Sequence, residues 1–164
     1  LKQKFNSLDI KAYLSQVGGI PVIRNRPLPG KVNALLSQSA DKGDSLGAVI
    51  SCEVNGLPAG LGNPFFDSLE SLLSHAIFAI PGIKGITFGL GFEETLLTGS
   101  QNPHIGGIAG GISNGDPVSF QIAVKPTPTV GGHGRHDACF ALRVPVVAEA
   151  VTAIVLADLS MTPA

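Results

Sequence analysis

A dense group of polar side chains stands near the carboxyl end of the chain, in the run HGRHDAC at residues 133–139. Arg135, His136 and Asp137 are consecutive, with His133 before them and Cys139 after them. A carboxylate flanked by positive charge is suited to act as a base or a proton relay, which makes Asp137 a candidate catalytic residue. A surface loop with ordinary charges is an equally good interpretation of this run by itself.

The spacing of His133, His136 and Cys139 also raises the possibility of a metal site. These residues lack the CxxC or HExxH spacing of zinc sites and supply at most three ligands. A small zinc-binding domain is therefore a minor alternative, and we expect no metal.

A second run, KPTPT at 125–129, combines a lysine and two threonines with two prolines. Its members are Lys125, Pro126, Thr127, Pro128 and Thr129. The proline rings restrict the backbone, so an ammonium group and two hydroxyls are held ready for an anion such as phosphate. An ordinary turn after a strand is the alternative.

A third run, GGIAGGISNG at 106–115, offers a backbone that a flat ring or an anion can approach without interference from Cβ atoms. Gly110 lies near its middle. The run is neither a GxGxxG fingerprint nor a P-loop, and filler in a loop explains it equally well. The segment 99–115 is too rich in glycine for us to expect a regular element there.

The elements that must position these runs follow from hydrophobic periodicity. Strands are predicted at 8–17, 46–54, 83–88 and 118–124, and helices at 32–40, 68–80 and after Pro145. Asp67 is the predicted cap of the second helix, with Glu70 completing a capping box. The last helix is apolar on nearly every side, which predicts that it is buried and covered on two sides. We therefore expect an α+β fold, with a mainly antiparallel sheet layered with long buried helices.

Composition indicates one domain over residues 1–164 in a reducing compartment. The net charge of −1 argues against a general nucleic-acid binder, and the two cysteines do not make a disulfide framework. We find no resemblance to a signal peptide or a membrane span, so a cytoplasmic protein is expected.

Taken together, the runs GGISNG at 110–115, KPTPT at 125–129 and GRHDAC at 134–139 resemble the carboxy-terminal half of the chorismate synthase family. The segments 42–50, 83–93 and 144–159 extend the resemblance over nearly the whole chain. It implies conversion of 5-enolpyruvylshikimate 3-phosphate to chorismate and phosphate, with reduced FMN required although there is no net redox change. It further implies helices between two antiparallel sheets, a homotetramer, and a cytoplasmic location, or a plastid in a plant or alga.

The resemblance also assigns roles by position. Asp137 matches an aspartate placed near the flavin N5 that assists proton transfer. The matches to flavin-contacting residues are Gly110, Lys125, Pro126, Thr127, Pro128, Thr129 and Arg135.

The chain lacks counterparts of the family's amino-terminal motifs. Missing are the GESHG and RPGHAD histidines and the RxSAR arginines, which carry acid–base work and bind the substrate phosphate. We therefore expect a fragment, a shortened form or a half-length homologue that is impaired when alone. The alternative is a non-catalytic flavin- or anion-binding half-domain, or a structural one, with the same fold.

Overall fold

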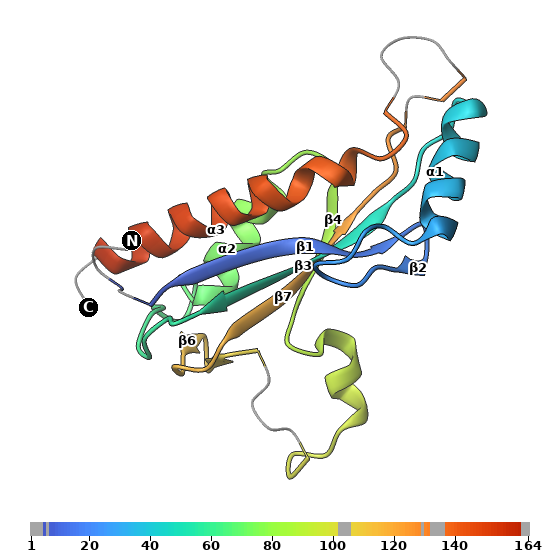
Figure 1. Ribbon diagram of the computed structural model, residues 1–164. Coiled ribbons are helices and arrows are strands. Elements are labelled where there is room, and N and C mark those ends of the chain that lie inside the picture. Colours follow the sequence, from blue (N-terminus) through green and yellow to red (C-terminus); the bar gives the residue numbers. More distant parts are fainter. Residues whose placement is uncertain (1–4, 6, 102–105, 129, 132–136, 162–164) are drawn as a thin grey trace.

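The structure is a computed structural model that describes residues 5, 7–101, 106–128, 130–131 and 137–161. It is built around an antiparallel sheet with the strand order β2-β1-β3-β7-β4 (Figure 1). The strands are β1 (Asp9–Val17), β2 (Ile20–Pro21), β3 (Ala48–Asn55), β4 (Ile83–Phe88) and β7 (Val118–Val124). The predicted strands at 8–17, 46–54, 83–88 and 118–124 are thus confirmed as β1, β3, β4 and β7.

The centre of the sheet supplies the core. Ile50, Cys52 and Val54 on β3 pair with Ile122, Phe120 and Val118 on β7, and all of them are buried. Because side chains alternate along a strand, these residues share one face of the sheet. The apolar residues of the alternating pattern that predicted these strands therefore lie on this face.

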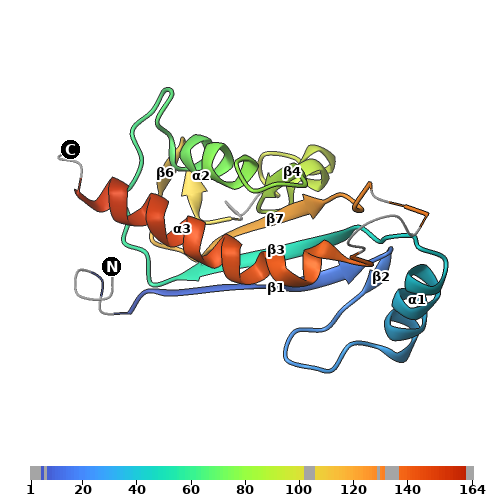
Figure 2. The same ribbon diagram turned by 90° about the horizontal axis from the view of Figure 1, so that it is seen from above.

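Two helices lie on this face of the sheet: α2 (Leu69–Phe78) and α3 (Val144–Met161). Figure 2 shows α3 running along the sheet above β1 and β3, with α2 beside it. The first helix, α1 (Gly30–Asp41), lies at one end of the sheet near β2. Short 3-10 turns, η1 (Gly91–Leu96) and η2 (Phe140–Arg143), complete the described helical elements. The expected α+β architecture of an antiparallel sheet with helices is confirmed.

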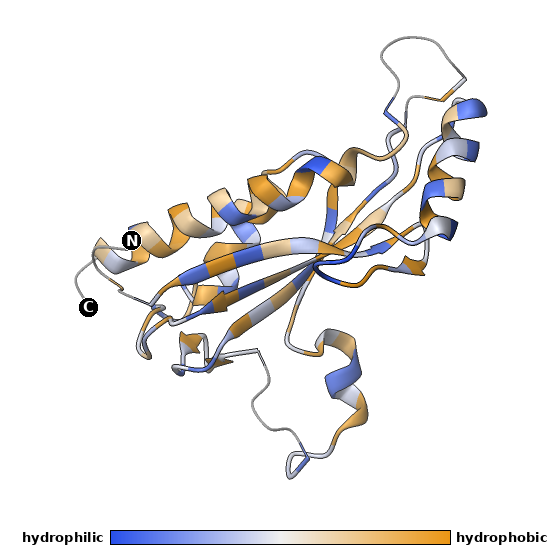
Figure 3. Ribbon diagram, viewed as in Figure 1, coloured by the Kyte–Doolittle hydropathy of each residue, from blue (hydrophilic) through white to orange (hydrophobic). Residues whose placement is uncertain are grey.

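Burial along α3 follows helical spacing. The buried positions are Val144, Ala148, Thr152, Val155, Leu156 and Ser160. The opposite stripe is apolar too, yet Val146 and Ile154 are each 68% exposed. Figure 3 shows how little of this helix is hydrophilic. The expectation that α3 is covered on two sides is therefore wrong for the described chain, which covers one side.

Residues 140–161, which include α3, are long and apolar enough to cross a membrane by length and composition. A long core helix of a soluble protein meets the same criterion. Here one side of α3 packs on β1, β3 and α2, as a core helix does.

Two local predictions need correction. The cap of α2 is Ser68, not Asp67, because the Ser68 hydroxyl accepts a hydrogen bond from the Ser71 N–H at 3.2 Å. Glu70 then stands one position too early to complete a capping box. In addition, the glycine-rich segment does contain a regular element, a small hairpin of β5 (Ile108–Ala109) and β6 (Ile112–Ser113).

Candidate functional site

Residues 125–128, the described part of the KPTPT run and called the KPTP run from here on, follow the end of β7. They line a pocket to which Asp137 also contributes. Immediately after β7, the Lys125 N–H donates a hydrogen bond to the Gly82 carbonyl at 2.9 Å, which ties the run to the loop before β4. The pocket has a volume of about 300 Å³. Its lining consists of Pro81, Gly82, Lys125, Pro126, Thr127, Pro128, Asp137 and Phe140. Runs that are separate in sequence thus meet at one place.

The walls of this pocket are mostly apolar rings. Gly82 has a φ of 88° and lies beside the Phe140 ring, which would be 3.7 Å from a Cβ atom at this position. A positive φ of this size favours glycine, whereas the ring distance by itself is an ordinary van der Waals contact. Flat apolar walls of this kind suit a planar ligand.

The polar groups at the pocket differ in their exposure and in whether they have hydrogen-bond partners. Lys125 is exposed, and the Thr127 Oγ1 atom is buried without a hydrogen-bond partner among the described residues. Buried hydroxyls normally have a partner, so this atom lacks a hydrogen bond that a ligand or a water molecule would supply. Lys125 and Thr127 are therefore the polar groups of the KPTP run best placed to bind an anion.

Asp137 is held at both of its carboxylate oxygens. The Cys139 N–H donates a hydrogen bond to Oδ1 at 3.1 Å, and Arg143 Nη1 lies 3.0 Å from Oδ2. The Asp137 side chain is 25% exposed. These contacts fix its orientation while leaving part of it accessible from the pocket. Sequence reasoning missed Arg143, whose only signal was a basic residue six positions further along the chain.

Cys139 is a structural residue in this arrangement. It is 2% exposed, and burial raises the pKa of its thiol above the usual value. A buried thiol kept in its neutral form is a poor nucleophile and a poor metal ligand. His133 and His136 lie outside the described residues, and the described part of the chain contains no group of three potential metal ligands.

Of the remaining predicted site residues, the structure describes only Gly110, which does not line this pocket. Gly110 lies in the turn between β5 and β6, which precedes β7, whereas the pocket lies beyond the other end of β7. A seven-residue strand spans roughly 20 Å, so Gly110 does not line the same pocket. Its contact with the flavin stays a prediction. Thr129 and Arg135 lie outside the described residues.

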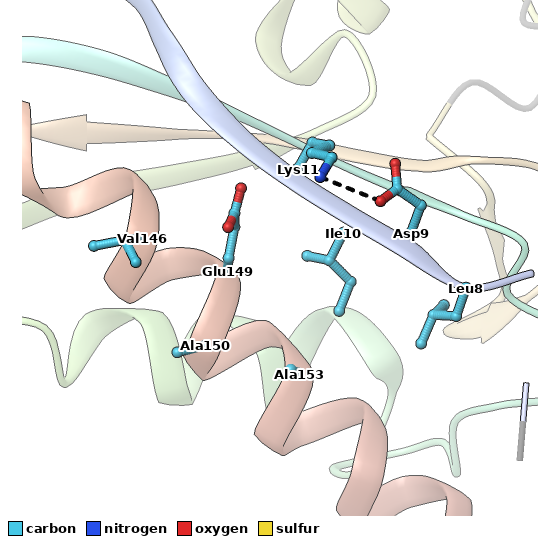
Figure 4. A pocket seen from close by; sticks show the side chains of 8 residues that line it. All are labelled: Leu8, Asp9, Ile10, Lys11, Val146, Glu149, Ala150 and Ala153. Atoms are coloured by element: carbon cyan, nitrogen blue, oxygen red, sulfur yellow. Dashed lines mark ion pairs between the residues drawn. The ribbon is translucent and has the colours of Figure 1, made fainter. Parts of the chain in front are cut away.

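A larger groove of about 530 Å³ runs between β1 and α3 (Figure 4). Glu149 reaches from α3 toward β1, where its Oε1 accepts a hydrogen bond from the Ala12 N–H at 2.8 Å. Lys11 and Asp9 form an exposed ion pair on the rim. The smaller pocket, unlike this groove, brings together residues of the KPTPT and GRHDAC runs, so it is the better candidate for chemistry.

Comparison with known proteins identifies chorismate synthases as relatives of this chain. The family model for chorismate synthase matches residues 1–161. A chorismate synthase from Chitinophaga pinensis is 42% identical over 181 residues, which cover 92% of this chain and 52% of the relative. One from Dehalococcoides mccartyi is 44% identical over 163 residues, covering 80% of this chain and 45% of the relative.

The fold leads to the same relatives. A crystal structure of chorismate synthase superposes with a TM-score of 0.81 at 26% identity, covering 96% of this chain and 58% of the other. The chain spans about half the length of the curated relatives it matches. Since the family model matches nearly every residue and the fold agrees, the chain belongs to the chorismate synthase family.

Proposed function

We propose that this chain forms the flavin-binding part of a chorismate synthase, which converts 5-enolpyruvylshikimate 3-phosphate to chorismate and phosphate with reduced FMN. The observation that carries the proposal is the meeting of Lys125, Thr127 and Asp137 at one pocket with apolar walls. Family membership names the reaction, and the pocket supplies groups suited to it. Other candidate functions are outcomes of the experiment below.

The residues present fit part of an FMN molecule. The apolar walls suit a flat ring system, and the unpartnered Thr127 hydroxyl and the Lys125 ammonium suit a phosphate or a ring oxygen. Ligand pockets commonly measure about 300–1,000 Å³, so this one is at the small end. The rest of the flavin and most of the substrate would be covered by parts of the enzyme beyond the described residues.

The protein's own groups would then have separate tasks. When bound, reduced FMN would supply electron density to the allylic system as phosphate leaves the substrate. Lys125 would bind an anionic group, Asp137 would hold or pass a proton at a carboxylate oxygen, and Phe140 with the prolines would exclude water. Exclusion of water strengthens the electrostatic interactions among the charged groups. Thr129, Arg135 and Gly110 remain proposed flavin contacts, and a homotetramer in the cytoplasm remains the proposed assembly and location.

FMN titration of the 164-residue chain tests this proposal. Oxidised and dithionite-reduced FMN are added, and binding is followed by flavin fluorescence or absorbance. We expect saturable binding. Lys125→Ala should weaken the affinity by about tenfold, because the variant loses one charge-assisted hydrogen bond to the flavin. Lys84→Ala is the matched control, because Lys84 is an exposed lysine on β4 that does not line the pocket.

Addition of the amino-terminal half of a relative then tests catalysis. Chorismate formation that Asp137→Asn abolishes would support the full proposal. Flavin binding without any chorismate would favour a non-catalytic flavin- or anion-binding module. An absence of binding in both redox states would overturn the flavin proposal and leave a structural half-domain.

A further inference from the structure

One turn, at residues 42–47 between α1 and β3, contacts both segments that build the pocket. The Ser45 side chain reaches the KPTP run, and the Leu46 backbone reaches the segment that contains Asp137. Neither residue lines the pocket itself. The turn therefore lies behind the pocket wall, in a position to set the distance between its two sides.

The contact with the KPTP run is a partly buried side-chain hydrogen bond. The Ser45 hydroxyl donates to the Thr127 carbonyl at 2.5 Å, and Ser45 is 8% exposed. The Ser45 N–H in turn donates to Asp44 Oδ1 at 2.7 Å, which fixes the turn locally. Thr127 thus has its carbonyl engaged from behind, while its hydroxyl has no partner among the described residues. Such a bond determines how the Thr127 residue is presented to the pocket.

The contact with the second segment is made by the next residue. The Leu46 N–H donates to the Ala138 carbonyl at 2.8 Å, between Asp137 and Cys139. The Gly43 carbonyl also accepts a hydrogen bond from the Gly131 N–H at 3.0 Å. Consecutive residues of one turn therefore hold the two segments that contribute Thr127 and Asp137.

Close packing leaves the turn little freedom to shift. A Cβ atom at Gly47 would lie 2.8 Å from the Val124 carbonyl oxygen and 3.1 Å from Pro126 Cδ. Only glycine allows this approach, since contacts under 3.0 Å force the backbone to move. The turn is pressed directly against the start of the KPTP run.

From these contacts we propose that Ser45 is a positioning residue of the flavin pocket, acting through the Thr127 carbonyl to hold the KPTP run in register with Asp137. The effect of Ser45 on flavin binding rests on the proposed function. The structural content of the inference, the coupling of the turn to both pocket segments, is independent of any ligand. Ser45 touches neither cofactor nor substrate in this proposal.

Amide hydrogen exchange of the 164-residue chain, read by NMR, tests the coupling without flavin. The Leu46, Lys125 and Cys139 amides report on the turn and on the two pocket segments, because each donates one of the hydrogen bonds described above. We expect Ser45→Ala to speed their exchange by about tenfold, as loss of one partly buried hydrogen bond implies. Ser45→Thr, which keeps the hydroxyl, should restore slow exchange.

Ser160→Ala is the matched control. Ser160 is also 8% exposed and its hydroxyl also donates to a backbone carbonyl, that of Ala157, but it lies near the end of α3. This variant should leave the three pocket amides unchanged. Equal exchange in Ser45→Ala and wild type, or equal acceleration in both variants, would overturn the proposal.

The affinity for reduced FMN is the second readout. Ser45→Ala should weaken it by about three- to tenfold, and Ser45→Thr should recover it. If the wild-type chain binds no flavin, the proposed function fails at this point, while the exchange experiment still decides whether Ser45 holds the pocket together. Flavin affinity unchanged by Ser45→Ala would refute the positioning role even if exchange is faster.

Discussion

Asp137, which we propose holds or passes a proton, has its carboxylate oriented by neighbouring groups. Its Oδ1 is fixed by a backbone N–H and its Oδ2 by a guanidinium, so its position does not depend on a ligand. Preorganised groups lose less free energy on binding than groups that must be ordered first. Asp137 is thus better suited to a precise proton transfer than a solvent-exposed loop aspartate would be.

Arg143→Ala tests this arrangement. The Arg143 side chain is 71% exposed, so its ion pair should contribute less than about 1 kcal/mol to the free energy of unfolding. Chorismate formation by the complemented enzyme should fall more strongly, because Asp137 loses one of its two restraints. Chemical denaturation and the rate of product formation measure the two effects, and Arg143→Lys should be intermediate in the second. A parallel loss in both measurements would contradict a specific effect on Asp137.

Cys52 provides a prediction about pH. Burial raises the pKa of its thiol from 9.0 to about 12, and the residue is 1% exposed on β3. Because the folded protein keeps the proton more tightly than the unfolded chain, the stability from this group is complete below about pH 9 and is lost as the pH rises toward 12.

The slope from Cys52 should approach about 1.4 kcal/mol per pH unit within this window. Denaturant unfolding at several pH values measures it. Cys52→Ala should flatten the curve relative to wild type between pH 9 and 12, even though it lowers the stability at neutral pH. Curves that stay parallel would show that the thiol is not responsible.

At the scale of elements, α2 depends on its first residue. The Ser68 hydroxyl accepts a hydrogen bond from the Ser71 N–H, whereas the predicted cap Asp67 forms a backbone bridge with Asn63 and caps no helix N–H among the described residues. Ser68→Ala should therefore lower the free energy of unfolding by about 1 kcal/mol, and Asp67→Ala by much less. Thermal or urea unfolding of the two variants compares them directly. A larger loss for Asp67→Ala would restore the capping interpretation made from sequence.

The small β5–β6 hairpin shows a signal that was present but overlooked. Gly110 and Gly111 have φ values of 61° and 85°, and both lie in its two-residue turn. Two-residue hairpin turns of this kind need positive φ at both positions, which is why paired glycines favour them. The Ile108 and Ile112 side chains flank the pair, so the pattern was readable as a hairpin as well as a loop.

At the scale of the whole molecule, one side of α3 is an exposed apolar stripe. Val146, Ile154 and Met161 are each at least 68% exposed. Contiguous apolar surface of this kind commonly marks an interface. Since the relatives are about twice as long, we propose that the half not matched here covers this stripe in them, and that a second copy of this chain covers it when that half is absent.

We therefore expect the isolated chain to self-associate through α3, and Ile154→Lys to make it monomeric. Burial of a charge in such an interface would be unfavourable, whereas the exposed position in the single chain tolerates it. Sedimentation equilibrium measures the change in mass. Ala34→Lys, at an exposed position of α1, is the matched control and should leave the association intact. A wild-type monomer at tens of micromolar would contradict this prediction.

The sequence by itself predicted the four long strands and the three α-helices, and its resemblance to known motifs indicated the family. Alternation of apolar side chains predicted β1, β3, β4 and β7, because residues on a half-buried strand face the core at every second position. The joint occurrence of its three motifs indicated the family and selected Lys125 and Asp137 as candidates. Neighbouring residues carry the signal for strands and helices, whereas the family came from a resemblance to known motifs.

Only the tertiary structure decided which residues share a pocket. Gly82, Lys125, Asp137 and Phe140 meet because antiparallel pairing brings the start of β4 beside the end of β7, and the segment before α3 packs against both. Ser45 supports that pocket from a turn that lies 82 residues before Thr127 in the chain. No periodicity or spacing encodes such contacts, because they depend on how separate elements pack and not on the residues within any one of them.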